Sequence, residues 1–310
     1  MQYLFTAKQA KQLDEHAIQE VGFPGTVLME KAATILSSVI SQSIRMDEGI
    51  LFVCGCGNNG GDAVAAARIL KQQGYHTAIV LVGETSRMSE DLFLQLRLAA
   101  ASDVEAVTAA EVDSAEYPIL VDGLFGVGLN RPVEGVYRAM IEQMNRSQKR
   151  IFAIDIPSGI HGDTGKVLGT AVKAETTVTF GVNKLGLVLY PGCGYAGNVV
   201  IGDIGYPACS YEAIENPAYY YDKKDMENCL PQRKPDGHKG TFGHVLVIGG
   251  SKNMCGAAVF AAKAAYRLGA GLVKVLSASE NRQMILTMLP EALTDTYTRM
   301  HLSKDWHLRM

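Results

Sequence analysis

The chain has 310 residues, of which 47% are hydrophobic and 20% charged, and its formal net charge is -3. This composition is typical of a folded globular protein, and the length predicts two folded units. The charge provides no basic patch for nucleic acid, and no run approaches the roughly 18 apolar residues of a membrane span. We therefore expect small-molecule partners and neither a nucleic-acid nor a membrane partner.

The cysteines indicate the compartment. Six of them, at positions 54, 56, 193, 209, 229 and 255, are scattered without a CxxC pair. The first residues turn polar within a few positions, so an apolar signal-peptide core is missing there. Both features predict a reduced, cytoplasmic protein, and a homo-oligomer is compatible with them.

The predicted elements alternate along the chain. Thr6 and Gln9 form a capping-box pattern that begins one helix, and a second helix is predicted from Thr26. Short apolar runs bounded by glycine then predict strands at 50–54, 77–82, 119–122, 151–156, 176–181 and 198–205, with helices at 62–73, 90–101 and 135–145. Strands alternating with helices predict a parallel sheet covered on both faces, a three-layer αβα Rossmann-like fold.

Pro207, Pro217 and a run of polar residues follow this pattern, which predicts a linker. We expect a first domain over residues 1–210, a linker over 211–237 and a second α/β unit over 238–310. The last ten residues, HLSKDWHLRM, show no cap or strand pattern.

A glycine-rich turn follows the first predicted strand. Gly55, Gly57 and Gly60 fit G-x-G-x-x-G, which either seats a pyrophosphate or simply makes a tight turn. Asp62, at the predicted helix start, would repel a pyrophosphate, which argues against an ordinary NAD-dependent oxidoreductase. Amide side chains and glycines in this turn are suited to a polar-ligand or cation site, formed by Asn58, Asn59, Gly60, Gly61 and Asp62.

Two other predicted strands end in polar residues. Asp122 and Asp155 directly follow apolar residues, and Ser158 lies shortly after. In open α/β sheets ligands bind at the carboxyl ends of strands, although each aspartate alone could simply cap a helix or close a turn. Oxygen atoms of Asn59, Asp122 and Ser158 carry one formal negative charge together, which favours a monovalent cation.

The chain resembles the NAD(P)H-hydrate epimerase family in several motifs, in the expected order over roughly residues 5 to 210: LMEKAA, GCGNNGGDAVAAARIL, VDGLFGVGLNRP, DIPSGIHGDTG and TVTFGVNKLGL. The resemblance implies an enzyme that interconverts the R and S forms of NADHX and NADPHX, which are hydrated at C6 of the nicotinamide ring. It also implies a K+ site at Asn59, Asp122 and Ser158. The substrate contacts that it implies are Asn58, Asn59, Gly60, Gly61, Asp62, Gly126, Val127, Gly128, Leu129, Asn130, Arg131, Pro132 and Asp155.

Epimerisation at C6 requires either loss and return of the hydroxyl or ring opening, and both need a proton donor and acceptor. We predict Asp155 as this catalytic group, with substrate positioning as its alternative role, and Arg131 as a phosphate ligand. Residues from 238 onward resemble the start of the ADP- or ATP-dependent NAD(P)H-hydrate dehydratase domain, which is ribokinase-like. Only about two βα units of it are visible, which leaves dehydratase activity open. A non-catalytic nucleotide-binding module is the alternative to the epimerase.

Overall fold

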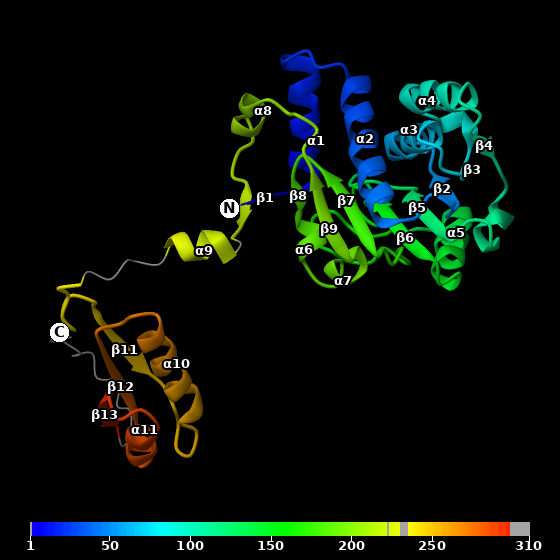
Figure 1. Cartoon of the computed structure of the whole chain (residues 1–310). Coiled ribbons are helices and arrows are strands. Elements are labelled where there is room, and N and C mark those ends of the chain that lie inside the picture. The colour runs from blue at the N-terminus through cyan, green and yellow to red at the C-terminus, as the bar shows by residue number, and fades with distance from the viewer. Residues whose placement is uncertain (1, 222, 230–234, 298–310) are drawn as a thin grey trace. The chain divides into compact units, whose positions relative to one another are not determined.

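The computed structural model describes residues 2–221, 223–229 and 235–297 (Figure 1). The chain forms two compact units, residues 1–222 and 223–310. No helix in the described ranges is long and apolar enough to cross a membrane. The ten C-terminal residues, for which the sequence predicts no pattern, lie outside the described residues.

A seven-stranded sheet forms the centre of the first unit. All its neighbouring strands are parallel, in the order β4-β3-β2-β5-β6-β7-β9. The strands are β2 (Ile50–Cys54), β3 (Thr77–Leu81), β4 (Glu105–Ala106), β5 (Ile119–Gly123), β6 (Arg150–Ile154), β7 (Thr176–Phe180) and β9 (Asn198–Gly202). Every residue of the central strands β2 and β5 is buried. Continuous apolar runs, rather than alternating ones, are what a parallel sheet covered on both faces requires.

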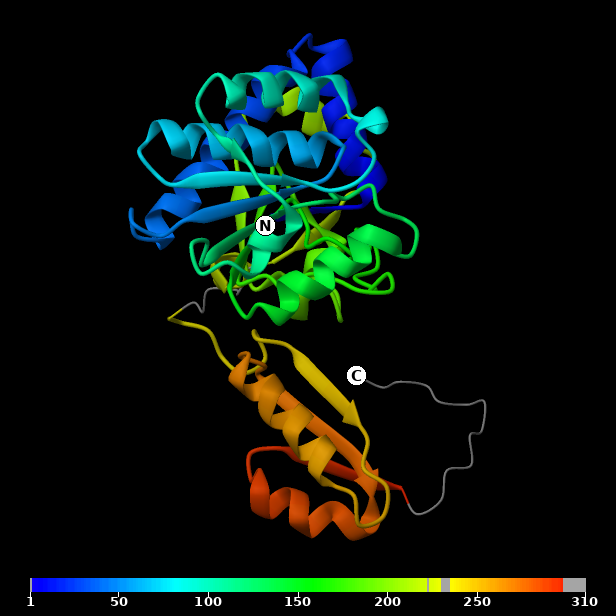
Figure 2. The ribbon, with the colours of Figure 1, turned by 90° about the vertical axis from the view of Figure 1, so that its right-hand side faces the viewer.

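Helices cover both faces of this sheet and make three layers (Figure 2). One face packs against α2 (Gly25–Ser43), α3 (Asn58–Gln72) and α4 (Glu90–Ala100). The other packs against α5 (Gly135–Arg146) and the 3-10 helix Ala109–Asp113. The predicted αβα Rossmann-like architecture is confirmed.

A second, three-stranded sheet involves the chain's first residues. β1 (Gln2–Phe5) pairs in parallel with β8 (Asn183–Lys184) and antiparallel with β10 (Ala218–Tyr220). Residues 208–220, which the sequence assigned largely to a linker, therefore belong to the first unit. Its remaining helices are α1 (Ala7–Glu15), the π-helix His16–Glu20, the 3-10 helix Thr85–Arg87, α6 (Leu185–Val188), α7 (Cys193–Ala196) and α8 (Ala208–Glu212).

Helix α3 begins four residues earlier than the sequence predicts, at Asn58 instead of Asp62. Gly60 lies inside this helix and Gly55 before it, and both glycines pack closely against neighbouring backbone. A Cβ atom on Gly60 would lie 2.0 Å from the carbonyl oxygen of Gly55, and one on Gly55 would lie 2.1 Å from that of Leu124. The glycines therefore permit close packing inside and before the helix, and Asp62 lies one turn in from its start.

The second unit contains a parallel three-stranded sheet in the order β11-β12-β13. Its elements are α9 (Lys223–Cys229), β11 (His244–Ile248), α10 (Gly256–Arg267), β12 (Leu272–Ala278), the 3-10 helix Ser279–Asn281, α11 (Arg282–Met288) and β13 (Leu293–Tyr297). A small core forms around Val273 and Val275. Leu246, Ile248 and Leu293 are 42%, 58% and 52% exposed, so apolar side chains of this sheet are accessible to solvent.

Candidate active site

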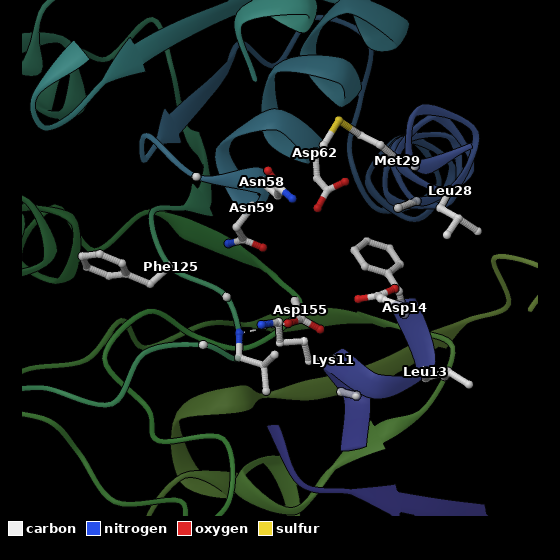
Figure 3. A pocket seen from close by; sticks show the side chains of 18 of the residues that line it. Lys11, Leu13, Asp14, Leu28, Met29, Asn58, Asn59, Asp62, Phe125 and Asp155 are labelled. Atoms are coloured by element: carbon white, nitrogen blue, oxygen red, sulfur yellow. Dashed lines mark hydrogen bonds between the residues drawn. The ribbon is translucent and has the colours of Figure 1, made fainter. Parts of the chain in front are cut away.

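A cavity of about 690 Å³ lies in the first unit (Figure 3). The segments that follow β2, β5 and β6 contribute to its wall, together with residues of α1, α2 and β8. Ligands of open α/β sheets bind at the carboxyl ends of the strands, and a volume of this size accommodates a small organic ligand. The topology therefore brings the predicted polar strand ends to one site.

The first turns of α3 form one wall. Asn58, Asn59 and Asp62 line the cavity, whereas Gly60 and Gly61 are buried and do not line it. A Cβ atom on Gly61 would lie 2.8 Å from Cε of Met29, which places this glycine against α2. The two glycines thus serve packing, while the amides and the acid are presented to the cavity.

The loop after β5 forms a second wall. Its residues Gly126, Val127, Gly128, Leu129, Asn130 and Arg131 all line the cavity, and the exposed Pro132 does not. The amide N–H of Val127 donates a hydrogen bond of 3.1 Å to Oδ2 of Asp155. The loop is therefore fixed to the end of β6.

Asp155 lies directly after β6 and lines the same cavity with a positive φ of 66°. Its Oδ1 is 2.6 Å from Nζ of Lys184, whose side chain is only 4% exposed, compared with 15% for Asp155. Lys184 Nζ also donates to Oγ1 of Thr179 at 2.7 Å and to the carbonyl oxygen of Phe180 at 3.1 Å. A left-handed backbone at a residue other than glycine, beside a buried ion pair, is a combination that clusters at functional sites.

Asp122 and Ser158 lie behind this wall and are both fully buried. Ser158 donates to Asp122 through its hydroxyl, at 2.6 Å to Oδ1, and through its amide, at 2.8 Å to Oδ2. The Leu124 amide is 3.2 Å from Oδ1. Burial raises the pKa of Asp122 to about 6 despite these hydrogen bonds.

Asn59 is the third residue predicted for the cation. Its amide nitrogen Nδ2 is buried and has no hydrogen-bond partner in the described part of the chain. Its backbone and side chain both approach the loop after β5: ideal Cβ atoms on Gly123 and Gly126 would lie 3.2 Å from its carbonyl oxygen and 3.4 Å from Oδ1. A bound cation would be held by oxygen atoms, here Oδ1 of Asn59 and the buried carboxyl of Asp122, which has no cationic partner among the described residues; the Nδ2 donor would need an acceptor instead.

Two further carboxyls face the cavity, Asp62 from α3 and Asp14 from α1 (Figure 3). Burial raises the pKa of Asp62 well above its usual value, and the charges of Asp155, Asp14 and Asp91 add to this effect. Burial also raises the pKa of Asp14, and a hydrogen bond from the Tyr206 hydroxyl opposes this shift. The site therefore concentrates carboxyl groups that resist ionisation.

Sequence reasoning did not assign several residues of this cavity. Lys184 stands in the motif TVTFGVNKLGL but received no role, and Asp14 and Tyr206 lie in segments without a recognised motif. A helix that carries apolar residues at core spacing gives no signal for which polar residue on its other side faces a cavity. Asp14 is recognised as a site residue only in the structure, where it lines the cavity and contacts Tyr206.

Residues 25–186 match the family described as YjeF-related protein N-terminus. The chain belongs to this family. A curated member, the NAD(P)H-hydrate epimerase of Oenococcus oeni, is 39% identical over 201 residues, which cover 64% of this chain and 95% of the relative. Its counterpart from Leuconostoc citreum is 40% identical over 202 residues, covering 65% and 90%. The resemblance seen in the sequence is confirmed.

Residues 245–308 match a second family, NAD(P)H-hydrate dehydratase. A protein with both names combined, the bifunctional NAD(P)H-hydrate repair enzyme Nnr of Thermofilum pendens, is 37% identical over 270 residues, or 85% of this chain. The chain spans 51% of that relative's length. Among solved structures, yeast ynu0 superposes with a TM-score of 0.62 over 72% of this chain and 97% of that one, at 19% identity, which supports the fold of the YjeF-related unit.

Proposed function

We propose that the first unit epimerises the hydrated nicotinamide nucleotides NADHX and NADPHX at C6. The observation that carries this proposal is the Asp155–Lys184 pair in the wall of the cavity, next to the amide-rich start of α3 and the loop 126–131. Curated epimerases that match nearly along their whole length support the same chemistry. The proposed substrate contacts are those predicted residues that line the cavity: Asn58, Asn59 and Asp62 of α3, the loop 126–131 and Asp155. Gly60, Gly61 and Pro132, also predicted from the sequence, do not line it.

The pair supplies the proton donor and acceptor that epimerisation needs. When the C6–O bond breaks, the hydroxyl takes up a proton and leaves as water, and the ring nitrogen lone pair forms the C6=N1 bond. Water then adds to the other face and returns the proton, so no oxidant or reductant is consumed. Asp155 and Lys184, 2.6 Å apart at the cavity wall, are placed to give and take this proton. Ring opening by cleavage of C6–N1 places the same demand on them.

Arg131 and the backbone of the loop 126–131 are proposed to bind the pyrophosphate of the substrate. Arg131 lines the cavity and is exposed, so its guanidinium is available for a phosphate. Asp62 lies one helical turn beyond the first amides of α3. The repulsion expected from an acid at the helix start is therefore reduced, and pyrophosphate can approach these amides.

We propose further that Asn59, Asp122 and Ser158 hold K+. The buried carboxyl of Asp122, the amide oxygen Oδ1 of Asn59 and the hydroxyl oxygen of Ser158 are the kind of oxygen ligands that a monovalent cation takes. A cation bound there would offset the charge of Asp122 and of nearby substrate phosphates.

All six cysteines are unpaired, which supports the expected reducing, cytoplasmic location.

Purified R-NADPHX tests the proposal directly. Added to the full chain, it should convert to the S form much faster than it does spontaneously, as followed by chromatographic separation of the two epimers. Tight binding without turnover would favour the non-catalytic module instead, and no acceleration would overturn the epimerase. Consumption of the S form in the presence of ADP or ATP would separately test the second unit for dehydratase activity.

A further inference from the structure

One wall of the cavity contains no residue that the sequence predicts as a ligand or as a catalytic group. It is formed by α1 and α2, by the end of β7 and by residues 204 and 206, and its lining includes Leu28, Met29, Phe180 and Ile204. Among these apolar side chains, α1 presents the carboxyl of Asp14 to the cavity (Figure 3). Lys11, Glu15 and Gln19 also line this wall, so Asp14 is one of a few polar groups beside apolar surface, the kind of arrangement that orients a ligand.

Tyr206 fixes this carboxyl in place. Its hydroxyl donates a hydrogen bond to Oδ1 of Asp14 across 192 residues of sequence. Asp14 lines the cavity, and no hydrogen bond to its Oδ2 occurs within the described ranges. One carboxylate oxygen is therefore occupied by the tyrosine, and the other remains able to accept a hydrogen bond from a ligand.

Asp14 shares one cavity with the reacting pair, because Asp14, Asp155 and Lys184 all line it. In the hydrated nicotinamide ring the carboxamide is attached at C3, directly across the ring from C6. With C6 at Asp155, the carboxamide extends away from the reacting pair, so it is the part of the ring that can meet a separate polar group of the wall.

We propose that Asp14, oriented by Tyr206, accepts a hydrogen bond from the carboxamide N–H of the hydrated nicotinamide and thereby selects substrates that carry this group. The inference rests on the proposed epimerase function and adds a specificity-determining subsite to it. Leu28, Met29 and Phe180 provide apolar surface around the ring. A carboxylate in place of the carboxamide would meet the like charge of Asp14, and an acetyl group would offer it no N–H.

The test compares two substrates, NADPHX and the hydrate of the reduced 3-acetylpyridine analogue, which differ in this one group. The full chain should epimerise NADPHX with a kcat/KM about 10 to 100 times higher, the range for a hydrogen bond to a charged group. Asp14→Ala should lower kcat/KM for NADPHX by about this factor, leave the acetyl analogue nearly unchanged and so remove the preference. Tyr206→Phe should reduce the preference in part.

Gln12→Ala, at an exposed residue of the same helix that does not line the cavity, is the matched control and should retain the wild-type preference. A preference that survives Asp14→Ala, or an equal loss on both substrates, would overturn the subsite. The failure of the epimerase proposal is distinguishable, because the wild-type chain would then accelerate neither substrate. In that case calorimetric titration with NADPH and with its reduced 3-acetylpyridine analogue tests the subsite by binding alone. Equal affinities of the wild-type chain for the two ligands would exclude carboxamide recognition by Asp14.

Discussion

Two aspartates that end neighbouring strands have opposite surroundings. Asp122, in β5, is fully buried, and its hydrogen bonds in the described part of the chain come from neutral donors, Ser158 and the Leu124 amide. Asp155, after β6, faces the cavity and pairs with the ammonium of Lys184. The first is suited to bind a cation, and the second to transfer a proton. The same sequence pattern, an aspartate at the end of a strand, thus occurs in two different environments.

The largest expected effect is on activity at Asp155. Asp155→Asn keeps an oxygen for Lys184 but removes the proton acceptor, so the epimerisation rate of the folded variant should fall about 10² to 10⁴-fold; the Tm should fall as well, because the buried ammonium of Lys184 loses its counter-charge. Asp47→Asn, on the exposed surface beside Arg45, is the control and should leave the rate unchanged. A rate within tenfold of the wild type would show that Asp155 acts by positioning the substrate.

The ion pair itself is tested from the lysine side. Lys184→Met leaves the carboxylate of Asp155 without its partner, and urea unfolding should show a loss of about 3 kcal/mol, at the lower end of the range because Asp155 keeps some exposure. The double variant Asp155→Asn with Lys184→Met should recover part of this loss. Additive losses would mean that the two side chains do not stabilise each other.

The cation is tested at Asp122. K+ should raise the Tm of the wild-type chain above its value in choline chloride at equal ionic strength, by about 2–4 °C for each kcal/mol of binding free energy. Asp122→Asn should abolish this difference because the site loses its only negative charge. A K+ effect that persists in this variant would place the cation elsewhere.

The carboxyl of Asp62 has surroundings different from those of Asp122 and Asp155, because it faces the cavity and none of the ion pairs in the described ranges includes it. Its pKa is raised by burial and by neighbouring carboxylates, so the folded state retains a proton that the unfolded state releases. Stability should therefore fall as pH rises from the unfolded value, 3.8, through the folded pKa. Asp62→Asn removes this loss.

The Tm advantage of Asp62→Asn over the wild type should accordingly grow from almost nothing near pH 4 to about 2–4 °C at pH 8. Asp47→Asn provides the opposite control, because Arg45 lowers the pKa of Asp47. Its Tm should not gain on the wild type as pH rises. An advantage for Asp62→Asn that shrinks with pH would contradict the assigned shift.

The sequence by itself determined the αβα sheet, because strands buried on both faces must be continuously apolar and glycines must mark the tight turns between them. It also determined that polar residues gather at one edge, since parallel strands end together. The family motifs then predicted the epimerase family, and residues 25–186 match the family described as YjeF-related protein N-terminus.

Tertiary structure alone determined which of those residues contact one another and which line the cavity. Lys184 reaches Asp155 because β8 pairs with β1 rather than with the large sheet, and Tyr206 reaches Asp14 over 192 residues. The start of α3 depended on how closely Gly60 packs against Gly55, and the end of the first unit on the pairing of β10 with β1. Such contacts join segments that are distant in the sequence and depend on burial in three dimensions. Local sequence patterns therefore do not predict them.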